Sequence, residues 1–178
     1  MTRLYLVRHG EAAGGWGDDF DPGLSERGRS QAAAMTTGLT PVVGRLPVVV
    51  SPLRRTRETA GFLESLWGVP ATVDPRVGEL PSPSLDLGER LTWLGQILTS
   101  PWDDWPADVQ SWRAAIPGTL LSISEDTVVV THYVFIGQAV GDPGYRPDYC
   151  SVTVVEHDGA PGSLRVVERG AQRSTVVR

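Results

Sequence analysis

The sequence predicts an α/β protein, a three-layer sandwich in which helices cover both faces of a central, mostly parallel mixed sheet. Two observations predict this class. Short apolar segments alternate along the chain with longer segments of helical character. Two of the short segments, residues 48–50 and 128–130, consist only of valine. Continuous apolar runs of this kind are typical of parallel strands that are buried on both faces.

The first part of the chain supplies one strand and one helix. Residues 4–7 form a short apolar run between polar residues, which is typical of a buried strand. A loop rich in glycine, aspartate and proline follows. A helix then begins at Ser25, which is a good N-cap residue, and runs to about Thr37. We expect Gly38 and Pro41 to end this helix.

The middle of the chain repeats the pattern. Residues 48–50 are the second strand, and residues 54–67 predict a helix that Gly68 and Pro70 terminate. Residues 71–73 are a candidate for a short third strand.

The second half of the chain continues the alternation and ends in a hairpin. We expect helices at residues 90–98, 102–116 and 133–140, a strand at residues 128–131, and hairpin strands at residues 152–155 and 164–167. His157 falls in the predicted hairpin turn, where we expect no functional role.

Composition limits both the domain organisation and the chemistry. A length of 178 residues suggests a single domain over residues 1–178. All 16 basic residues are arginine, and the absence of lysine excludes P-loop and Schiff-base chemistry. The single cysteine excludes an internal disulfide and a multi-cysteine zinc site. A net charge of -5 argues against a nucleic-acid partner.

We expect neither a targeting segment nor a membrane span. The N-terminal apolar run, residues 4–7, is too short for the core of a signal peptide. Nothing in the sequence approaches the roughly 20 apolar residues that cross a bilayer. These features predict a soluble, cytoplasmic protein with no membrane partner.

Reactive side chains directly follow the three strongest strands. Arg8, His9 and Gly10 come after the first, Arg55 with two neighbouring arginines after the second, and His132 after the third. Because ligands bind outside the carboxyl ends of strands in open α/β sheets, we expect these groups to meet. Arginine forks grip phosphate oxygens, a helix N-terminus adds N–H donors, and glycine allows close approach of an anion. Since histidine can attack phosphorus, the set predicts a phosphate site.

The same segments resemble a known family. Residues 4–11 (LYLVRHGE) resemble the RHG signature of the histidine phosphatase, or phosphoglycerate mutase-like, superfamily. Residues 21–28 (DPGLSERG) are similar to its loop and first helix, and residues 51–55 (SPLRR) to its second arginine motif. Residues 128–132 (VVVTH) resemble its second-histidine strand, and residues 149–153 (YCSVT) its late strand. The motifs occur in the family's order, which implies a phosphoglycerate mutase-like fold.

This resemblance implies a mechanism. His9 would be the catalytic nucleophile and form a phosphohistidine. Arg8, Arg55 and His132 would bind the phosphoryl group and stabilise its transition state, so that His132 is both catalytic and phosphate-binding. The stretch that ends at Glu79 resembles the one that carries the family's acid, which would protonate the leaving oxygen and then activate water. No metal and no cofactor are expected.

Alternatives exist for two of these roles. Arg54 and Arg57 compete with Arg55, and only the motif favours Arg55. Glu11 and Glu89 are rivals for the acid. The acid candidate Glu79 could also form a structural ion pair with Arg76 or Arg90.

Departures from the family's pattern bear on the substrate pocket. Many members have an asparagine in the loop after the RHG signature, where this chain has Gly15. Many have Gly-Gly after the second histidine, where this chain has Tyr133 and Val134. We therefore assign Tyr133, together with Trp16 of the glycine-rich loop, to the substrate pocket.

Four tryptophans lie between the candidate acid and the third strong strand. They are Trp93, Trp102, Trp105 and Trp112. Either they pack helices together, or some of them line the mouth of the pocket and contact an apolar leaving group.

The favoured function is hydrolysis of a small phosphate monoester through phosphohistidine, without a metal. Alternatives with the same residues are a phosphomutase, a protein-phosphohistidine phosphatase and a non-catalytic protein that binds phosphorylated ligands.

Overall fold

A computed structural model describes residues 1–15, 17–83, 85–142 and 144–172. These residues form a six-stranded sheet in the order β3-β2-β4-β1-β5-β6. The strands are β1 (Thr2–Arg8), β2 (Val48–Val50), β3 (Thr72–Val73), β4 (Thr127–Thr131), β5 (Val152–His157) and β6 (Arg165–Glu168). The first four are parallel to one another, β5 is antiparallel to β1, and β6 is antiparallel to β5. The predicted mostly parallel mixed sheet is confirmed.

The helices of the described residues alternate with these strands. They are α1 (Glu26–Val43), α2 (Arg54–Trp67), α3 (Leu87–Thr99), α4 (Ala107–Leu121) and α5 (Tyr133–Ala139), with 3₁₀ turns at Pro75–Val77 and Trp102–Asp104. Within these described ranges, no helix has both the length and the apolar character that a membrane span requires.

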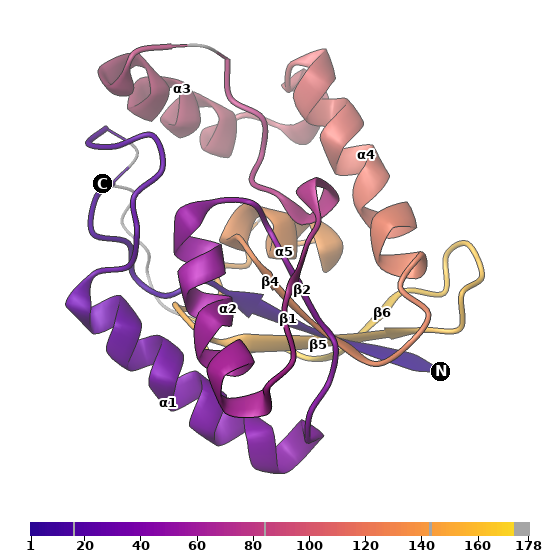
Figure 1. Cartoon of the computed structure of the whole chain (residues 1–178). Helices are drawn as coiled ribbons and strands as arrows, with labels where there is room; N and C mark the ends of the chain where they lie inside the picture. Colours follow the sequence, from indigo (N-terminus) through magenta and orange to yellow (C-terminus); the bar gives the residue numbers. More distant parts are fainter. Residues whose placement is uncertain (16, 84, 143, 173–178) are drawn as a thin grey trace.

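Helices cover both faces of the sheet (Figure 1). On one face, Leu4, Leu6 and Val129 pack with apolar side chains of α4 and α5. On the other face, Val7 and Val130 pack with apolar side chains of α1 and α2. Alternate residues of the central strands therefore belong to opposite cores. This explains why β2 and β4 are rich in valine on both sides, and it confirms the predicted three-layer sandwich.

Helix α1 is longer than the sequence predicts. It passes through Gly38 and Pro41 and ends at Val43, so the prediction that these two residues end it is wrong. Leu39 is buried against the sheet, and Val43 packs against the same core. This burial outweighs the single backbone hydrogen bond that Pro41 cannot donate.

Residues 102–116 do not form the single helix that we expected. A 3₁₀ turn at Trp102–Asp104 comes first, and α4 begins only at Ala107. Pro106 is the N-cap residue of α4. Because proline has no N–H group, it is tolerated at the start of a helix, and a helix extended back across Pro106 would lose a backbone hydrogen bond.

The start of α3 and the end of β5 also differ from the predicted positions, and local hydrogen bonds are found at both. Helix α3 begins at Leu87, before the predicted start, since Asp86 and Glu89 form a capping box there. His157 is the buried last residue of β5 and not part of the hairpin turn, so that prediction is wrong. Its Nδ1 accepts a hydrogen bond of 3.1 Å from the N–H of Gly159.

The loop after β1 lies directly against the N-terminus of α1. Ser25 is the N-cap residue, as predicted, and its Oγ accepts from the N–H of Gly28 at 2.9 Å. A Cβ added at Gly10 would lie 2.6 Å from the carbonyl oxygen of Gly28, and one added at Gly28 would overlap the carbonyl of Glu11. Packing of the loop on α1, rather than approach of an anion, therefore explains the glycine at position 10.

Replacing Gly28 with alanine is expected to destabilise the fold by about 1–3 kcal/mol, because the new Cβ would push the Glu11 carbonyl away from the helix. Gly38 of the same helix is a matched control, since no atom lies within 4 Å of a Cβ added there. Gly38→Ala should raise stability by about 1 kcal/mol through helix propensity. Denaturant unfolding measures the free energy of unfolding of both variants. If both substitutions change it in the same direction, the close contact between Gly28 and the Glu11 carbonyl is contradicted.

Candidate active site

Four adjacent parallel strands end at the same edge of the sheet, and each is followed by a candidate residue. Arg8 is the last residue of β1, and His9 follows it. Arg55 lies in the first turn of α2, after β2, and His132 is the N-cap residue of α5, directly after β4. Glu79 follows β3 and the first 3₁₀ turn. The structure thus brings the five predicted catalytic and phosphate-binding residues together.

His9 turns one ring nitrogen toward the other groups of the site. Its backbone N–H donates to the carbonyl of Thr131 on β4 at 3.1 Å, and its Nδ1 lies 2.7 Å from the carbonyl oxygen of Gly10. Because a carbonyl only accepts, Nδ1 carries the proton and Nε2 keeps its lone pair. The Nε of Arg55 lies 3.3 Å from Nε2.

Burial and nearby cations keep the His9 ring neutral. Burial lowers the pKa of His9 well below 6.5, and the charge of Arg55 lowers it further. At neutral pH the imidazole is therefore uncharged. Its Nε2 lone pair can act as a nucleophile without first losing a proton.

Glu79 joins Arg55 and His132 in one buried cluster. Its Oε2 lies 3.2 Å from Nδ1 of His132 and 3.5 Å from Nη2 of Arg55. On the other side of the ring, Nε2 of His132 lies 2.8 Å from Oγ of Ser51. A neutral His132 can donate from Nδ1 to Glu79 and accept from the Ser51 hydroxyl. Sequence reasoning misses Ser51, whose one signal is its place at the start of the SPLRR motif.

The charges in this cluster favour an ionised carboxylate. Burial raises the pKa of Glu79, but His132 and Arg55 together outweigh burial and bring the pKa below 4.5. Burial lowers the pKa of His132, and Glu79 offsets part of that effect. Arg76 pairs with Asp74 at 2.7 Å instead of with Glu79. The carboxylate of Glu79 thus belongs to the site and not to the ion pair with Arg76 that we considered.

Two tyrosine rings hold the guanidinium group of Arg8. Its Cζ lies 3.9 Å from the ring centroid of Tyr149 and 5.0 Å from that of Tyr133. Its Nη1 donates to the carbonyl of Pro147 at 2.8 Å. Burial lowers the pKa of Arg8, but a guanidinium starts so far above neutrality that it stays charged. The two rings therefore fix a cation beside His9, whose ring centroid is 5.9 Å from that of Tyr149.

Tyr133 reaches this site from the first turn of α5. Its ring is buried, and its hydroxyl has no hydrogen-bond partner among the residues that the structure describes. Burial raises the pKa of Tyr133, so the hydroxyl remains a donor at neutral pH. Tyr133 lies beside Arg8, and its role in a substrate pocket stays a prediction. The other pocket candidate, Trp16, lies outside the described residues.

The rival carboxylates have structural partners elsewhere. Glu11 accepts from Oγ of Ser25 at 2.9 Å and pairs with Arg27 at 3.8 Å. Glu89 belongs to the capping box of α3, where its side chain accepts from the N–H of Asp86. Both carboxylates therefore hold chain segments in place.

The rival arginines lie away from His9. The Nε of Arg54 donates to Glu58 at 2.8 Å, and Arg57 is exposed. The backbone N–H of Arg54 donates to Asp21 at 2.8 Å, so this donor of the α2 N-terminus is already in use. Only Arg55 of the three is buried beside the histidines.

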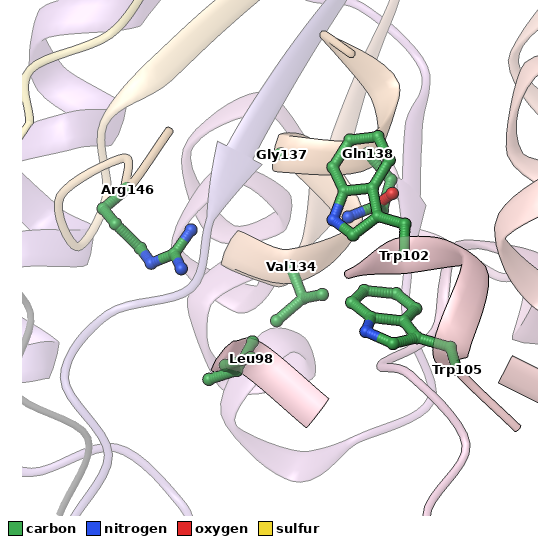
Figure 2. Close-up of a pocket in the computed structure, with 7 residues that line it drawn as sticks. All are labelled: Leu98, Trp102, Trp105, Val134, Gly137, Gln138 and Arg146. Carbon is green, nitrogen blue, oxygen red and sulfur yellow. The ribbon is translucent and has the colours of Figure 1, made fainter. Parts of the chain in front are cut away.

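The tryptophans of the second half pack helices together. Trp105 is buried, and its Nε1 donates to the carbonyl of Ile97 at 2.9 Å. Trp102 and Trp105 lie 6.3 Å apart between ring centroids and, with Leu98 and Val134, line a cavity of about 10 Å³ (Figure 2). Such a cavity has room for about one water molecule. None of the five candidate residues lines it, so the alternative that Trp105 lines the catalytic pocket is not supported.

A larger cavity, of about 250 Å³, opens on the site. Arg55 and Glu79 line it, as do Phe20, Leu80 and Arg90. Within the described ranges, no three His, Cys, Asp or Glu side chains are grouped so that they could hold a metal ion. The groups that this cavity offers for binding include two arginines, the Glu79 carboxylate and apolar side chains.

Fold and site together define an α/β protein with a buried histidine–arginine cluster at the carboxyl ends of its parallel strands, a site for an oxyanion. Residues 4–169 match the histidine phosphatase superfamily (branch 1). The chain belongs to this family, and the predicted resemblance is confirmed.

Named relatives agree with this assignment. The chain is 32% identical over 120 residues to a probable phosphoglycerate mutase, GpmB, of Erwinia tasmaniensis, an alignment that covers 65% of this chain and 50% of that protein. It is 31% identical over 117 residues to phosphoserine phosphatase 1 of Hydrogenobacter thermophilus, covering 63% and 51%. The aligned region thus spans about half the length of these relatives.

A solved structure supports the fold. Phosphoserine phosphatase of Entamoeba histolytica superimposes with a TM-score of 0.73 at 19% identity, covering 97% of this chain and 98% of that one. The phosphoglycerate mutase-like fold is therefore confirmed.

Proposed function

We propose that this chain is a phosphatase that hydrolyses a small phosphate monoester through a phosphohistidine on His9. One observation carries the proposal. The proton of His9 is held on Nδ1 by the Gly10 carbonyl, while Nε2 lies 3.3 Å from Nε of Arg55. A nucleophile is thus placed beside a group that binds phosphate oxygens.

His9, Glu79 and water account for every bond and every proton transfer of the proposed reaction. The Nε2 lone pair of His9 attacks phosphorus, the bond to the ester oxygen breaks, and Glu79 gives its proton to the departing alkoxide. Water then attacks the phosphohistidine and gives a proton to Glu79, and His9 leaves as the neutral imidazole. Arg8 and Arg55 donate to the phosphoryl oxygens, and His132 joins them when the bound phosphate displaces Glu79 from the Nδ1–H of His132. These donors stabilise the charge of both transition states.

Glu79 must be protonated before it can act as an acid. The free site holds it ionised, since its pKa lies below 4.5. A bound phosphate brings negative charge next to the carboxylate and competes with it for Arg55, and both effects raise its pKa. We therefore infer that Glu79 takes up a proton as the substrate binds.

Family membership and the relatives' names support this activity. One named relative is a phosphatase and another a probable mutase. A mutase would use the same groups but return the phosphoryl group to an organic acceptor instead of to water.

The test is release of inorganic phosphate from a broad panel of phosphate monoesters by the purified chain. We expect hydrolysis of at least one class of small monoester, and no phosphate release by the His9→Ala variant. Activity that survives in this variant would overturn the mechanism. Saturable phosphate binding without turnover of any ester would favour a non-catalytic binding protein.

Loss of the Tyr149 ring is expected to weaken phosphate binding. Tyr149→Ala removes the ring that lies 3.9 Å from the Arg8 guanidinium, and cation–π contacts of this kind are worth about 0.5–2 kcal/mol. Affinity for inorganic phosphate, measured by calorimetry, should fall about 2- to 30-fold. Tyr149→Phe keeps the ring and is the matched control. Equal losses in the two variants would show that the ring is not what positions Arg8.

A further inference from the structure

Both ring nitrogens of His132 have a partner, and one of these partners is a buried hydroxyl group. Nδ1 lies 3.2 Å from Oε2 of Glu79, and Nε2 lies 2.8 Å from Oγ of Ser51. Ser51 is completely buried, and so is His132. A separation of 2.8 Å is typical of a well-formed hydrogen bond. The proposed reaction assigns no step to Ser51, although it contacts a phosphate-binding residue.

The charges around the His132 ring favour its neutral form. Burial lowers the pKa of His132, and the Glu79 carboxylate raises it. The cations Arg55 and Arg8 lower the pKa again, so that it lies below 6.5. The His9 ring, whose centroid lies 5.2 Å away, is itself neutral. At neutral pH, His132 therefore has a single ring proton, which lies on either Nδ1 or Nε2.

The hydroxyl group of Ser51 indicates which nitrogen has the proton. Its Oγ accepts from the backbone N–H of Leu53 at 3.5 Å, and this contact does not use the hydroxyl proton. Among the residues that the structure describes, the other group within hydrogen-bond distance of Oγ is Nε2 of His132. A buried O–H group without an acceptor is costly. We therefore expect Ser51 to donate to Nε2, which requires a lone pair on that nitrogen.

The other neutral form of His132 fits these contacts less well. With the proton on Nε2, the Nδ1 lone pair could accept from Nη2 of Arg55, which lies 3.4 Å away. The same lone pair would face the ionised Glu79 carboxylate at 3.2 Å, and the two would repel each other. The Ser51 hydroxyl would also lose its acceptor. One long contact to Arg55 does not offset both costs.

The position of this proton matters because the two nitrogens of His132 face different surroundings. Nδ1 lies on the side of Arg55, whose Nε is 3.3 Å from Nε2 of His9. A phosphoryl group that Arg55 binds and His9 attacks would therefore come close to Nδ1. An N–H group at Nδ1 donates to a phosphoryl oxygen, whereas a lone pair there would repel that oxygen.

We propose that Ser51 is a positioning residue: by donating to Nε2 of His132, its hydroxyl group holds the proton of that ring on Nδ1, where the proton binds a phosphoryl oxygen. The part of Ser51 in catalysis rests on the proposed phosphatase function and deepens it. The proton position itself is a property of the free protein. Ser51 acts through His132 and not on the substrate.

Nitrogen-15 NMR of the unmodified chain tests the proton position without any substrate. The chain has three histidines, and the variants His9→Gln and His157→Gln assign the other two rings. At neutral pH we expect a protonated Nδ1 and an unprotonated Nε2 in His132. Saturating inorganic phosphate should shift the Nδ1 signal and leave Nε2 unprotonated. A proton on Nε2, or an Nδ1 signal that bound phosphate leaves unchanged, would overturn the proposal.

Variants of Ser51 assign the effect to its hydroxyl group. Ser51→Ala removes the donor that stabilises the neutral ring, so the pKa of His132 should rise and Nε2 should take up a proton at a higher pH. Ser51→Thr keeps a hydroxyl group and should preserve the original titration. Thr56→Val is the matched control, because Thr56 is also buried and donates to the carbonyl of Ser51 at 2.9 Å rather than to His132. An unchanged pKa in Ser51→Ala, or an equal rise in Thr56→Val, would contradict the role of the Ser51 hydroxyl.

The outcomes separate this inference from the proposed function. The expected proton on Nδ1 of His132, without hydrolysis of any monoester, would support the role of Ser51 in the free site and refute the phosphatase function. Hydrolysis of p-nitrophenyl phosphate by a chain with the proton on Nε2 would do the reverse. The measurement on the unmodified chain decides the proton position even if a substitution at Ser51 prevents folding.

Discussion

Replacing His9 with glutamine should lower kcat for ester hydrolysis by about 10⁴-fold or more, as loss of a covalent nucleophile does in other enzymes. The reason is that, in the proposed mechanism, Nε2 of His9 forms the bond to phosphorus. Glutamine keeps a polar side chain of similar length but offers no lone pair of comparable nucleophilicity. Phosphate release from a monoester that the unmodified chain hydrolyses, followed at a saturating concentration of that ester, measures the loss of kcat.

The control for this variant is another buried histidine. His157 lies at the end of β5, away from the cluster, so His157→Gln should keep kcat per folded molecule near that of the unmodified chain. The His9→Gln variant should still bind inorganic phosphate, since Arg8, Arg55 and His132 remain. A kcat within tenfold of the unmodified chain would exclude His9 as the nucleophile.

Glu79→Gln should slow hydrolysis of alkyl phosphates by about 10²- to 10⁴-fold, the usual contribution of a general acid. Glutamine cannot give a proton to the leaving alkoxide. The effect should shrink for p-nitrophenyl phosphate, whose phenolate leaves without protonation. It should be smallest for phosphohistidine, whose leaving nitrogen already carries the positive charge of the imidazolium. The values of kcat/KM on the three substrates measure this dependence, because they report the steps up to departure of the leaving group and not the later hydrolysis of phosphohistidine.

Glu89→Gln is the matched control for this second prediction. Glu89 was the rival acid, and glutamine preserves the capping box that it forms with Asp86. All three substrates should react normally with this variant. An equal loss of kcat/KM on all three substrates in Glu79→Gln would mean that Glu79 donates no proton to the leaving group and acts in this step only by positioning Arg55 and His132.

Most of the candidate active site could be predicted from the sequence, because parallel strands bring distant residues to one edge. His9 and His132 each follow a strand directly, so their meeting depends only on the strand order. Arg55 and Glu79 were harder to choose, because neighbouring arginines and carboxylates have the same chemistry. Burial distinguishes Arg55 and Glu79 from their rivals, and the burial of a side chain depends on the whole fold.

Other features depend on packing that has no local signature. The contact between Gly10 and Gly28 joins a loop to a helix, and glycine alone does not name its partner. Likewise, the sequence does not show that Tyr149 and Tyr133 would enclose Arg8. The passage of α1 through Pro41 is a case in which burial against the sheet overrides a strong local preference.

The most direct test of the account is to trap the phosphorylated enzyme. The chain is mixed with a phosphate monoester that it hydrolyses, and the reaction is quenched in alkaline denaturant within the first turnover. The protein is then digested for mass spectrometry and phosphorus NMR. We predict one phosphoryl group on His9, attached at Nε2, because the Gly10 carbonyl holds the proton on Nδ1. A phosphoryl group on another residue or on Nδ1, or steady turnover with His9 unmodified throughout, would contradict the account.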